Sequence, residues 1–220
     1  MKDSKYRKAF TLVEMIIVTS IIALLMTIIL PATQKVLLNS RKTKARTCMK
    51  EIAGAYCRYY QENGYIPDAT SSVALAEALA KNGELNNANL FVFPGDSKAA
   101  TVRRENIWPR DDDAEAWEID INKRLSVCLI GNITSEVDAA TTPIAFSRGL
   151  SEDGKWSSSE GVYGSDGGFI AFLDGQVRWY KDLSEDDGKL FKAGSNEKTS
   201  NINEAIPAEA KNLETLNTQY

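Results

Sequence analysis

A single carboxylate interrupts the long apolar block near the start of this 220-residue chain. The block runs from Phe10 to Leu30, and Glu14 is its one charged residue. An ionisable side chain inside such a block is costly to hold in a membrane, and by default it marks a functional site with a partner of opposite charge. Glu14 is therefore the first candidate functional residue, and we expect its partner to be a cation.

The apolar block is long enough to cross a bilayer as one helix. A membrane span needs about 20 apolar residues, and this block has 21, of which 13 are Leu, Ile, Val or Phe. Those 13 side chains contribute roughly −4 to −8 kcal/mol to insertion, whereas Glu14 costs at most about 3 kcal/mol. Insertion is favoured, so the sequence predicts a single-pass membrane helix.

The residues before the block resemble a processing signal. A short basic leader ends in Ala9, and Phe10 and Glu14 follow in the spacing of the prepilin signal found in type IV pilins and type II secretion pseudopilins. The resemblance implies that a prepilin peptidase cuts between Ala9 and Phe10 and methylates the new amino terminus of Phe10. Gly is the usual residue before the cut in this family, so Ala9 departs from its pattern.

Two other interpretations of the N-terminus are weaker. A secretory signal peptide would have a shorter apolar core, with the small-residue cleavage site at its far end, whereas here Ala9 precedes the core. A plain signal anchor remains an alternative, but it gives no reason for Glu14.

The resemblance also implies a role for Glu14. After cleavage, Glu14 lies about one helical turn from the amino group of Phe10. In a filament it would pair with the amino terminus of a neighbouring subunit, which neutralises two charges in apolar surroundings and fixes the axial register between helices. The implied partners are a prepilin peptidase, other pilin-like subunits in a homo-oligomeric filament, and the inner (cytoplasmic) membrane.

Charge alone leaves the orientation in the membrane open. Four basic residues precede the block, and six follow it: Lys35, Arg41, Lys42, Lys44, Arg46 and Lys50. The positive-inside rule does not decide between these two groups. The resemblance implies a cytoplasmic leader and a periplasmic head domain.

We expect an α+β, pilin-like fold in which one long N-terminal helix packs against a small antiparallel β-sheet head. Apolar residues at three- and four-residue spacing extend the helix to Glu62; they are Ala45, Met49, Ile52, Tyr56 and Tyr59. The predicted organisation is a basic leader at 1–9, a transmembrane or filament-core helix at 10–31, an amphipathic helix at 32–64, a globular head at 65–195 and a polar mobile tail at 196–220.

Within the head, local patterns predict one short helix and several strands. The helix runs over 73–81 with Ser71 or Ser72 as its N-cap, and strands are expected at 125–130 and from 143 to 146. The segment 142–182 resembles the C-terminal part of GspG-like pseudopilins.

The clearest β-hairpin covers residues 169–180. Asp174-Gly175 is a typical two-residue hairpin loop, which would pair Leu173 with Gln176. That register predicts a core-facing set on one face of the hairpin, made of Ile170, Phe172, Val177 and Trp179.

Composition argues against catalysis and against nucleic-acid binding. The chain has no His, which is the commonest general base and metal ligand, and its net charge of −4 gives no general attraction to nucleic acid. Cys48, Cys57 and Cys128 lack a metal-binding spacing. We expect free thiols, with a Cys57–Cys128 disulfide as the alternative.

No catalytic, cofactor-binding or metal-binding residue is predicted. The acidic residues after the hairpin match no defined calcium loop; they are Asp182, Glu185, Asp186 and Asp187.

The resemblance to pilins and pseudopilins implies a structural function, as a filament subunit that supports protein secretion. A type II secretion pseudopilin is favoured over a type IV pilus subunit, because the head lacks the paired C-terminal cysteines that often close the pilin loop. The alternative is a membrane-anchored periplasmic binding module, for example for carbohydrate, that uses three aromatic side chains expected to be exposed, Trp108, Trp117 and Trp156. An anchored hydrolase is weaker still, because the chain has neither His nor a triad-like arrangement.

Overall fold

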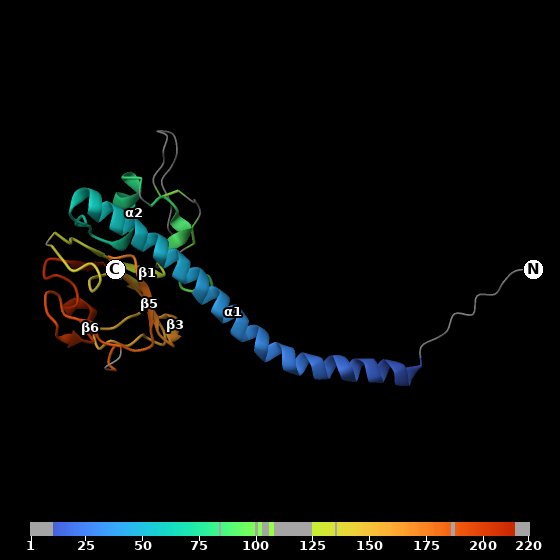
Figure 1. Ribbon diagram of the computed structural model, residues 1–220. Coiled ribbons are helices and arrows are strands. Elements are labelled where there is room, and N and C mark those ends of the chain that lie inside the picture. Colours follow the sequence, from blue (N-terminus) through green and yellow to red (C-terminus); the bar gives the residue numbers. More distant parts are fainter. Residues whose placement is uncertain are drawn as a thin grey trace, which may run out of the picture. The chain divides into compact units, whose positions relative to one another are not determined.

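Two compact units make up the described chain. The structure is a computed structural model that describes residues 11–83, 85–99, 101–102, 106–107, 125–134, 136–185 and 188–213. The division falls inside the first helix, α1 (Leu12–Asn63): residues up to Lys42 form one unit, and residues from Thr43 form the other, which we call the head unit. Figure 1 labels α1 together with α2, β1, β3, β5 and β6 of the head unit.

The first unit is the apolar half of α1. Every side chain from Thr11 to Leu30 is exposed, and mean hydropathy reaches 2.6 over an 18-residue window. Hydroxyl groups in this stretch donate hydrogen bonds to carbonyls one turn earlier, as from Ser20 Oγ to the Ile16 carbonyl at 2.7 Å. Such bonds keep polar side chains satisfied within hydrocarbon. This half of α1 is therefore long and apolar enough to span a membrane.

In the head unit, the predicted apolar stripe of α1 is confirmed. Its five members are buried: Ala45, Met49, Ile52, Tyr56 and Tyr59. The hydroxyl of Tyr56 donates to the carbonyl of Ile130 in strand β1 (Val127–Gly131) at 3.3 Å. Burial raises the pKa of Tyr56 well above its ordinary value, so the hydroxyl keeps its proton and remains a donor. This contact ties the helix to the sheet.

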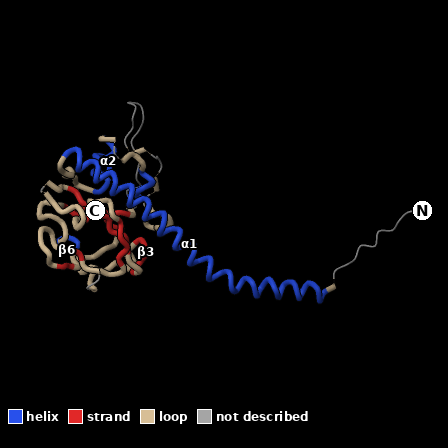
Figure 2. The backbone as a smooth tube through the Cα atoms, viewed as in Figure 1, coloured by secondary structure: helices blue, strands red, loops and turns tan. Residues whose placement is uncertain are grey.

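The sheet of the head unit has five antiparallel strands in the order β5-β4-β2-β1-β8. Besides β1, these are β2 (Pro143–Ser147), β4 (Gly168–Phe172), β5 (Val177–Tyr180) and β8 (Lys211–Leu213). The predicted fold class is confirmed: the protein is α+β and pilin-like, with one long N-terminal helix packed with an antiparallel sheet. Figure 2 distinguishes the strands from the surrounding loops.

The remaining elements are short. They are α2 (Ser72–Lys81), η1 (Ala88–Phe91), β3 (Val162–Ser165), β6 (Leu190–Phe191), β7 (Lys198–Thr199) and η2 (Ile202–Glu204). Strands β6 and β7 pair with each other as a separate two-stranded sheet. The predicted cap of α2 is confirmed at Ser71, whose side chain accepts from the Ala74 N–H at 3.2 Å.

The predicted hairpin forms, but its predicted register is wrong by one residue. Trp179 lies opposite Phe169, and Val177 lies opposite Ala171. The loop has three residues in place of two: Phe172 N–H donates to the Gln176 carbonyl, and Gly175 takes a left-handed φ of 84°. A left-handed Gly at the end of a three-residue loop is a common alternative to the two-residue turn.

This shift changes which side chains share a face. Ile170 and Phe172 lie on the opposite face from Val177 and Trp179, because one residue of slip exchanges the faces of a strand. Trp179 is half-buried, and its ring meets that of Phe169 edge-on, with the centroids 4.9 Å apart. The prediction that these four side chains share one face is therefore wrong, although Ile170, Phe172 and Val177 are buried in the core.

The predicted mobile tail from residue 196 is wrong for residues 196–213. Strand β8 pairs with β1, with Leu213 opposite Leu129. Ile202, Ile206 and Leu213 are buried in the same core cluster as the stripe of α1. Although this segment is polar on average, its few apolar residues are spaced so that they reach the core. Residues 214–220 of the predicted tail lie outside the described residues.

Ser72 connects the C-terminal strand to the helix α2. Its buried hydroxyl accepts from the Leu129 N–H at 3.0 Å and donates to the Leu213 carbonyl. One hydroxyl therefore links α2, β1 and β8.

We expect Ser72→Ala to destabilise the head unit by about 1–3 kcal/mol, because the substitution leaves buried backbone groups of β1 and β8 without a partner. Urea unfolding of the full chain in mild detergent measures this loss. The matched control is Ser71→Ala, which removes only the α2 cap and should cost about 1 kcal/mol. A Ser72→Ala variant that unfolds at the same urea concentration as the natural chain would contradict this expectation.

A buried ion pair lies at the other end of β1 and β2. Arg148 Nη2 lies 2.8 Å from Asp96 Oδ1, and both side chains are 3% exposed. Arg148 also donates from Nη1 to the Leu125 carbonyl at 2.8 Å and from Nε to the Glu160 carbonyl at 3.1 Å. The other oxygen of Asp96 accepts from Ser126 Oγ at 2.7 Å. The pair therefore links the chain around residues 96, 125–126, 148 and 160.

Candidate functional site

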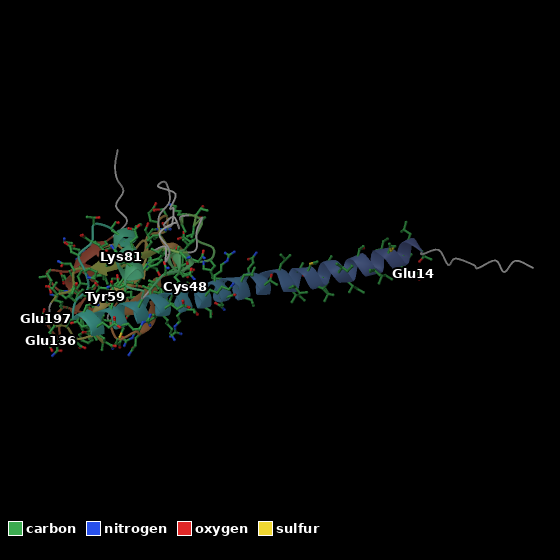
Figure 3. The ribbon with its side chains drawn as sticks, turned by 90° about the horizontal axis from the view of Figure 1, so that it is seen from above. Glu14, Cys48, Tyr59, Lys81, Glu136 and Glu197 are labelled. Atoms are coloured by element: carbon green, nitrogen blue, oxygen red, sulfur yellow. The ribbon has the colours of Figure 1, made fainter. Side chains whose placement is uncertain are left out.

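Glu14 lies in the first turn of α1 (Figure 3), and it takes part in a reciprocal helix cap with Thr11. Its backbone N–H donates to Thr11 Oγ1 at 3.2 Å. In return, Glu14 Oε2 accepts from the Thr11 N–H and from Thr11 Oγ1, each at 2.8 Å. This is a capping box, in which a Thr and a Glu three residues later satisfy donors that the helix start leaves free.

The cap uses only one oxygen of the Glu14 carboxylate. Within the described part of the chain, no hydrogen bond reaches the second oxygen, Oε1, and the side chain is exposed. Glu14 is also the one charged residue between positions 11 and 34. The arrangement therefore holds a negatively charged oxygen at a fixed position near the start of an apolar helix.

Thr11 is a site residue that the sequence analysis missed. Its signal was present in the sequence, because Thr followed three residues later by Glu before an apolar run is the pattern of a capping box. The predicted processing residues, Ala9 and Phe10, lie outside the described residues. The structure therefore shows Glu14 with Thr11 and leaves the cleavage position as a prediction.

The tryptophans proposed for a binding module do not form an exposed surface in the described residues. Trp156 is buried, at 4% exposure, and it lies directly against Gly168 of β4, where an added Cβ would stand 2.3 Å from its Nε1. The assignment of Trp156 as an exposed ligand-binding side chain is therefore wrong. Trp108 and Trp117 lie outside the described residues.

All three cysteines are free thiols. Cys128 is buried in β1, whereas Cys48 and Cys57 on α1 are half-buried. Burial, with a contribution from the Glu51 carboxylate, raises the pKa of the Cys48 thiol. The thiol therefore stays protonated at neutral pH and is a weak nucleophile.

The acidic segment after β5 does not assemble a cation site in the described residues. Asp182 Oδ1 accepts from the Ser184 N–H at 2.7 Å, which lowers the pKa of this carboxyl. No group of three or more His, Cys, Asp or Glu side chains in the described ranges has an arrangement that could hold a metal ion.

A family model described as the prokaryotic N-terminal methylation motif matches residues 4–30. No curated protein and no solved structure matches the chain. The matched range contains Ala9, Phe10, Thr11 and Glu14, together with the apolar half of α1 to Leu30. The chain therefore carries the N-terminal motif of type IV pilin-like proteins, joined to a helix that can anchor it in a membrane.

Proposed function

We propose that the protein is a pseudopilin, a structural subunit of a type II secretion or type IV pilus-like filament that supports protein secretion. In this proposal a prepilin peptidase removes residues 1–9 and methylates the amino group of Phe10. The mature chain then stays in the inner membrane through α1, with its head in the periplasm, until it joins a filament of other pilin-like subunits. Its role is structural and not enzymatic.

The observation that most strongly supports this function is the hydrogen bonding of the Glu14 carboxylate. Cleavage after Ala9 would create an ammonium group on Phe10, one residue before Thr11. The capping box holds Glu14 Oε2 against Thr11 and leaves Oε1 without a partner among the described residues. An unpaired carboxylate oxygen in an apolar bundle is costly, and a cation from another chain removes that cost. In this proposal the amino group of Phe10 in an adjacent mature subunit supplies that cation.

The exposure of the apolar half of α1 supports assembly through this helix. Large apolar side chains such as Ile16, Leu24 and Ile28 are 54–66% exposed. Such a surface needs lipid before assembly and other helices after it. In both settings α1 satisfies its own backbone hydrogen bonds, so only side-chain packing changes between the two.

Processing gives the direct test of this function. We expect the mature protein, extracted from membranes of cells that contain a prepilin peptidase, to begin with N-methylated Phe10. Mass spectrometry of the intact chain and of its N-terminal peptide measures this. In cells without the peptidase the leader should remain attached.

Two results would contradict the proposal. A chain that keeps residues 1–9 when the peptidase is present would show that the motif is not processed. A chain that begins beyond Leu30 would show that the apolar block is a removable signal peptide.

A further inference from the structure

A second charged feature of α1 follows the apolar block. Residues 31–50 contain six basic residues and no acidic residue, whereas residues 51–220 contain 16 basic and 28 acidic residues. Lys35 and Arg41 are exposed, and in the described part of the chain no ion pair involves either side chain. The positive charge is therefore concentrated in residues 31–50, directly after the apolar block, whereas the rest of the chain beyond residue 50 carries net negative charge.

Apolar side chains accompany these basic residues. Val36, Leu37 and Leu38 are 66%, 58% and 38% exposed. Exposed apolar side chains interleaved with Lys and Arg are typical of segments that lie at the boundary between headgroups and acyl chains. Long basic side chains suit that boundary, because their aliphatic part lies along apolar surface while the charge reaches the headgroups.

The position along the helix fits the headgroup layer. At 1.5 Å per residue, Lys35 lies about 8 Å beyond Leu30 and Arg41 about 16 Å beyond it. The headgroup region extends roughly 5–8 Å beyond the hydrocarbon on each side. Lys35 therefore falls within or at the edge of that region. The backbone of Arg41 and Lys42 lies roughly 9–13 Å beyond it, slightly more than the Debye length of about 8 Å at physiological salt, and their long side chains can cover part of that distance.

We propose that Lys35, Arg41 and Lys42, with the apolar residues Val36–Leu38, form a docking site for anionic phospholipid headgroups. Headgroups such as phosphatidylglycerol carry the phosphate oxygens that Lys and Arg bind, and basic residues next to a span are attracted to them over a Debye length. The site holds this part of α1 against the membrane surface before the subunit is recruited. This proposal requires that α1 is anchored in a membrane, as in the proposed function, but it does not require that a filament assembles.

The test compares lysine reactivity in two kinds of vesicle. The full chain is reconstituted at a low protein-to-lipid ratio in phosphatidylcholine alone, or in phosphatidylcholine with added phosphatidylglycerol. A membrane-impermeant, amine-reactive ester labels the accessible lysines, and mass spectrometry quantifies each position. Lys155 and Lys181 are exposed on the head unit and serve as internal references.

We expect labelling of Lys35, relative to Lys155 and Lys181, to fall about threefold or more when phosphatidylglycerol is present. Labelling should recover in about 1 M salt, where the Debye length is only about 3 Å. The double variant Arg41→Gln with Lys42→Gln should also restore the labelling of Lys35. The matched control, Arg178→Gln with Lys198→Gln, removes one Arg and one Lys from the head unit and should leave the protection of Lys35 intact.

Three results would overturn the proposal. The first is equal labelling of Lys35 in the two kinds of vesicle. The second is protection that persists in the Arg41→Gln, Lys42→Gln variant, because a general effect of the charged surface would then explain it. The third is protection that follows the protein-to-lipid ratio whatever the lipid charge, which would identify a second copy of the chain as the occupant. Processing at Phe10 is measured separately, so failure here leaves the proposed function standing.

Discussion

Arg148→Met is expected to destabilise the head unit by about 3–5 kcal/mol, the typical cost of removing one partner from a buried ion pair. The substitution keeps much of the side-chain volume but leaves the Asp96 carboxylate in a site where it is 3% exposed. It also leaves the Leu125 and Glu160 carbonyls without their guanidinium donors. Urea unfolding of the full chain in mild detergent, followed by Trp fluorescence, measures the loss.

An exposed ion pair in the same region provides the matched control. Lys98 Nζ lies 2.7 Å from Glu160 Oε1, but these side chains are 47% and 42% exposed. Exposed pairs contribute about 0–1 kcal/mol, so Lys98→Met should have a small effect. Equal losses for Arg148→Met and Lys98→Met would show that burial does not determine the cost.

A double variant separates the two causes of the loss. Asp96→Asn combined with Arg148→Met removes the unpaired buried charge, and it should recover part of the stability that Arg148→Met loses. The remaining loss measures the carbonyl contacts of Arg148. If the double variant were less stable than Arg148→Met alone, the ion pair would not be the main contribution of Arg148.

Local patterns in the sequence were sufficient to predict the two α-helices, α1 and α2. The stripe from Ala45 to Tyr59 predicted the buried face of α1, because helical spacing is a local property of the chain. Ser71 likewise predicted the start of α2 from the preference of Ser for N-caps. A helix that is long and apolar enough to span a membrane was predictable from length and composition alone.

Features that depend on distant residues were not predictable in this way. The ion pair joins Asp96 to Arg148, which are 52 positions apart, and neither residue stands out within its own segment. Strand β8 is only three residues long. It depends on pairing with β1, in which Leu213 lies opposite Leu129. Average polarity made the C-terminal segment resemble a tail, since a few well-placed apolar side chains hardly change a composition.

The wrong register predicted for the β4–β5 hairpin and the unpredicted role of Thr11 have different causes. Asp174-Gly175 is compatible with loops of two or three residues, and the choice between them depends on contacts outside the hairpin. One such contact is the hydrogen bond from Leu173 N–H to the Thr142 carbonyl. The role of Thr11 is a local property of the sequence, because Thr followed three residues later by Glu is the pattern of a capping box.

Glu14→Leu is expected to abolish recruitment into a filament while it preserves membrane insertion. Leu is a better membrane residue than Glu, so insertion should be equal or stronger. Processing should persist, because in the prepilin-type resemblance the peptidase depends chiefly on the leader and the residue before the cut. Crosslinking between subunits, or sedimentation of sheared filaments, measures recruitment, and membrane fractionation measures insertion.

The capping box makes a second explanation testable, because Glu14→Leu removes a helix cap as well as a charge. Glu14→Gln keeps a side chain that can complete the capping box but has no charge. Thr11→Val keeps the charge but removes the hydroxyl that donates to Glu14 Oε2 and accepts from the Glu14 N–H. If charge pairing controls assembly, Glu14→Gln should fail like Glu14→Leu, and Thr11→Val should assemble. If Glu14→Gln assembles and Thr11→Val fails, the cap is the essential feature, and pairing with the Phe10 ammonium is not required.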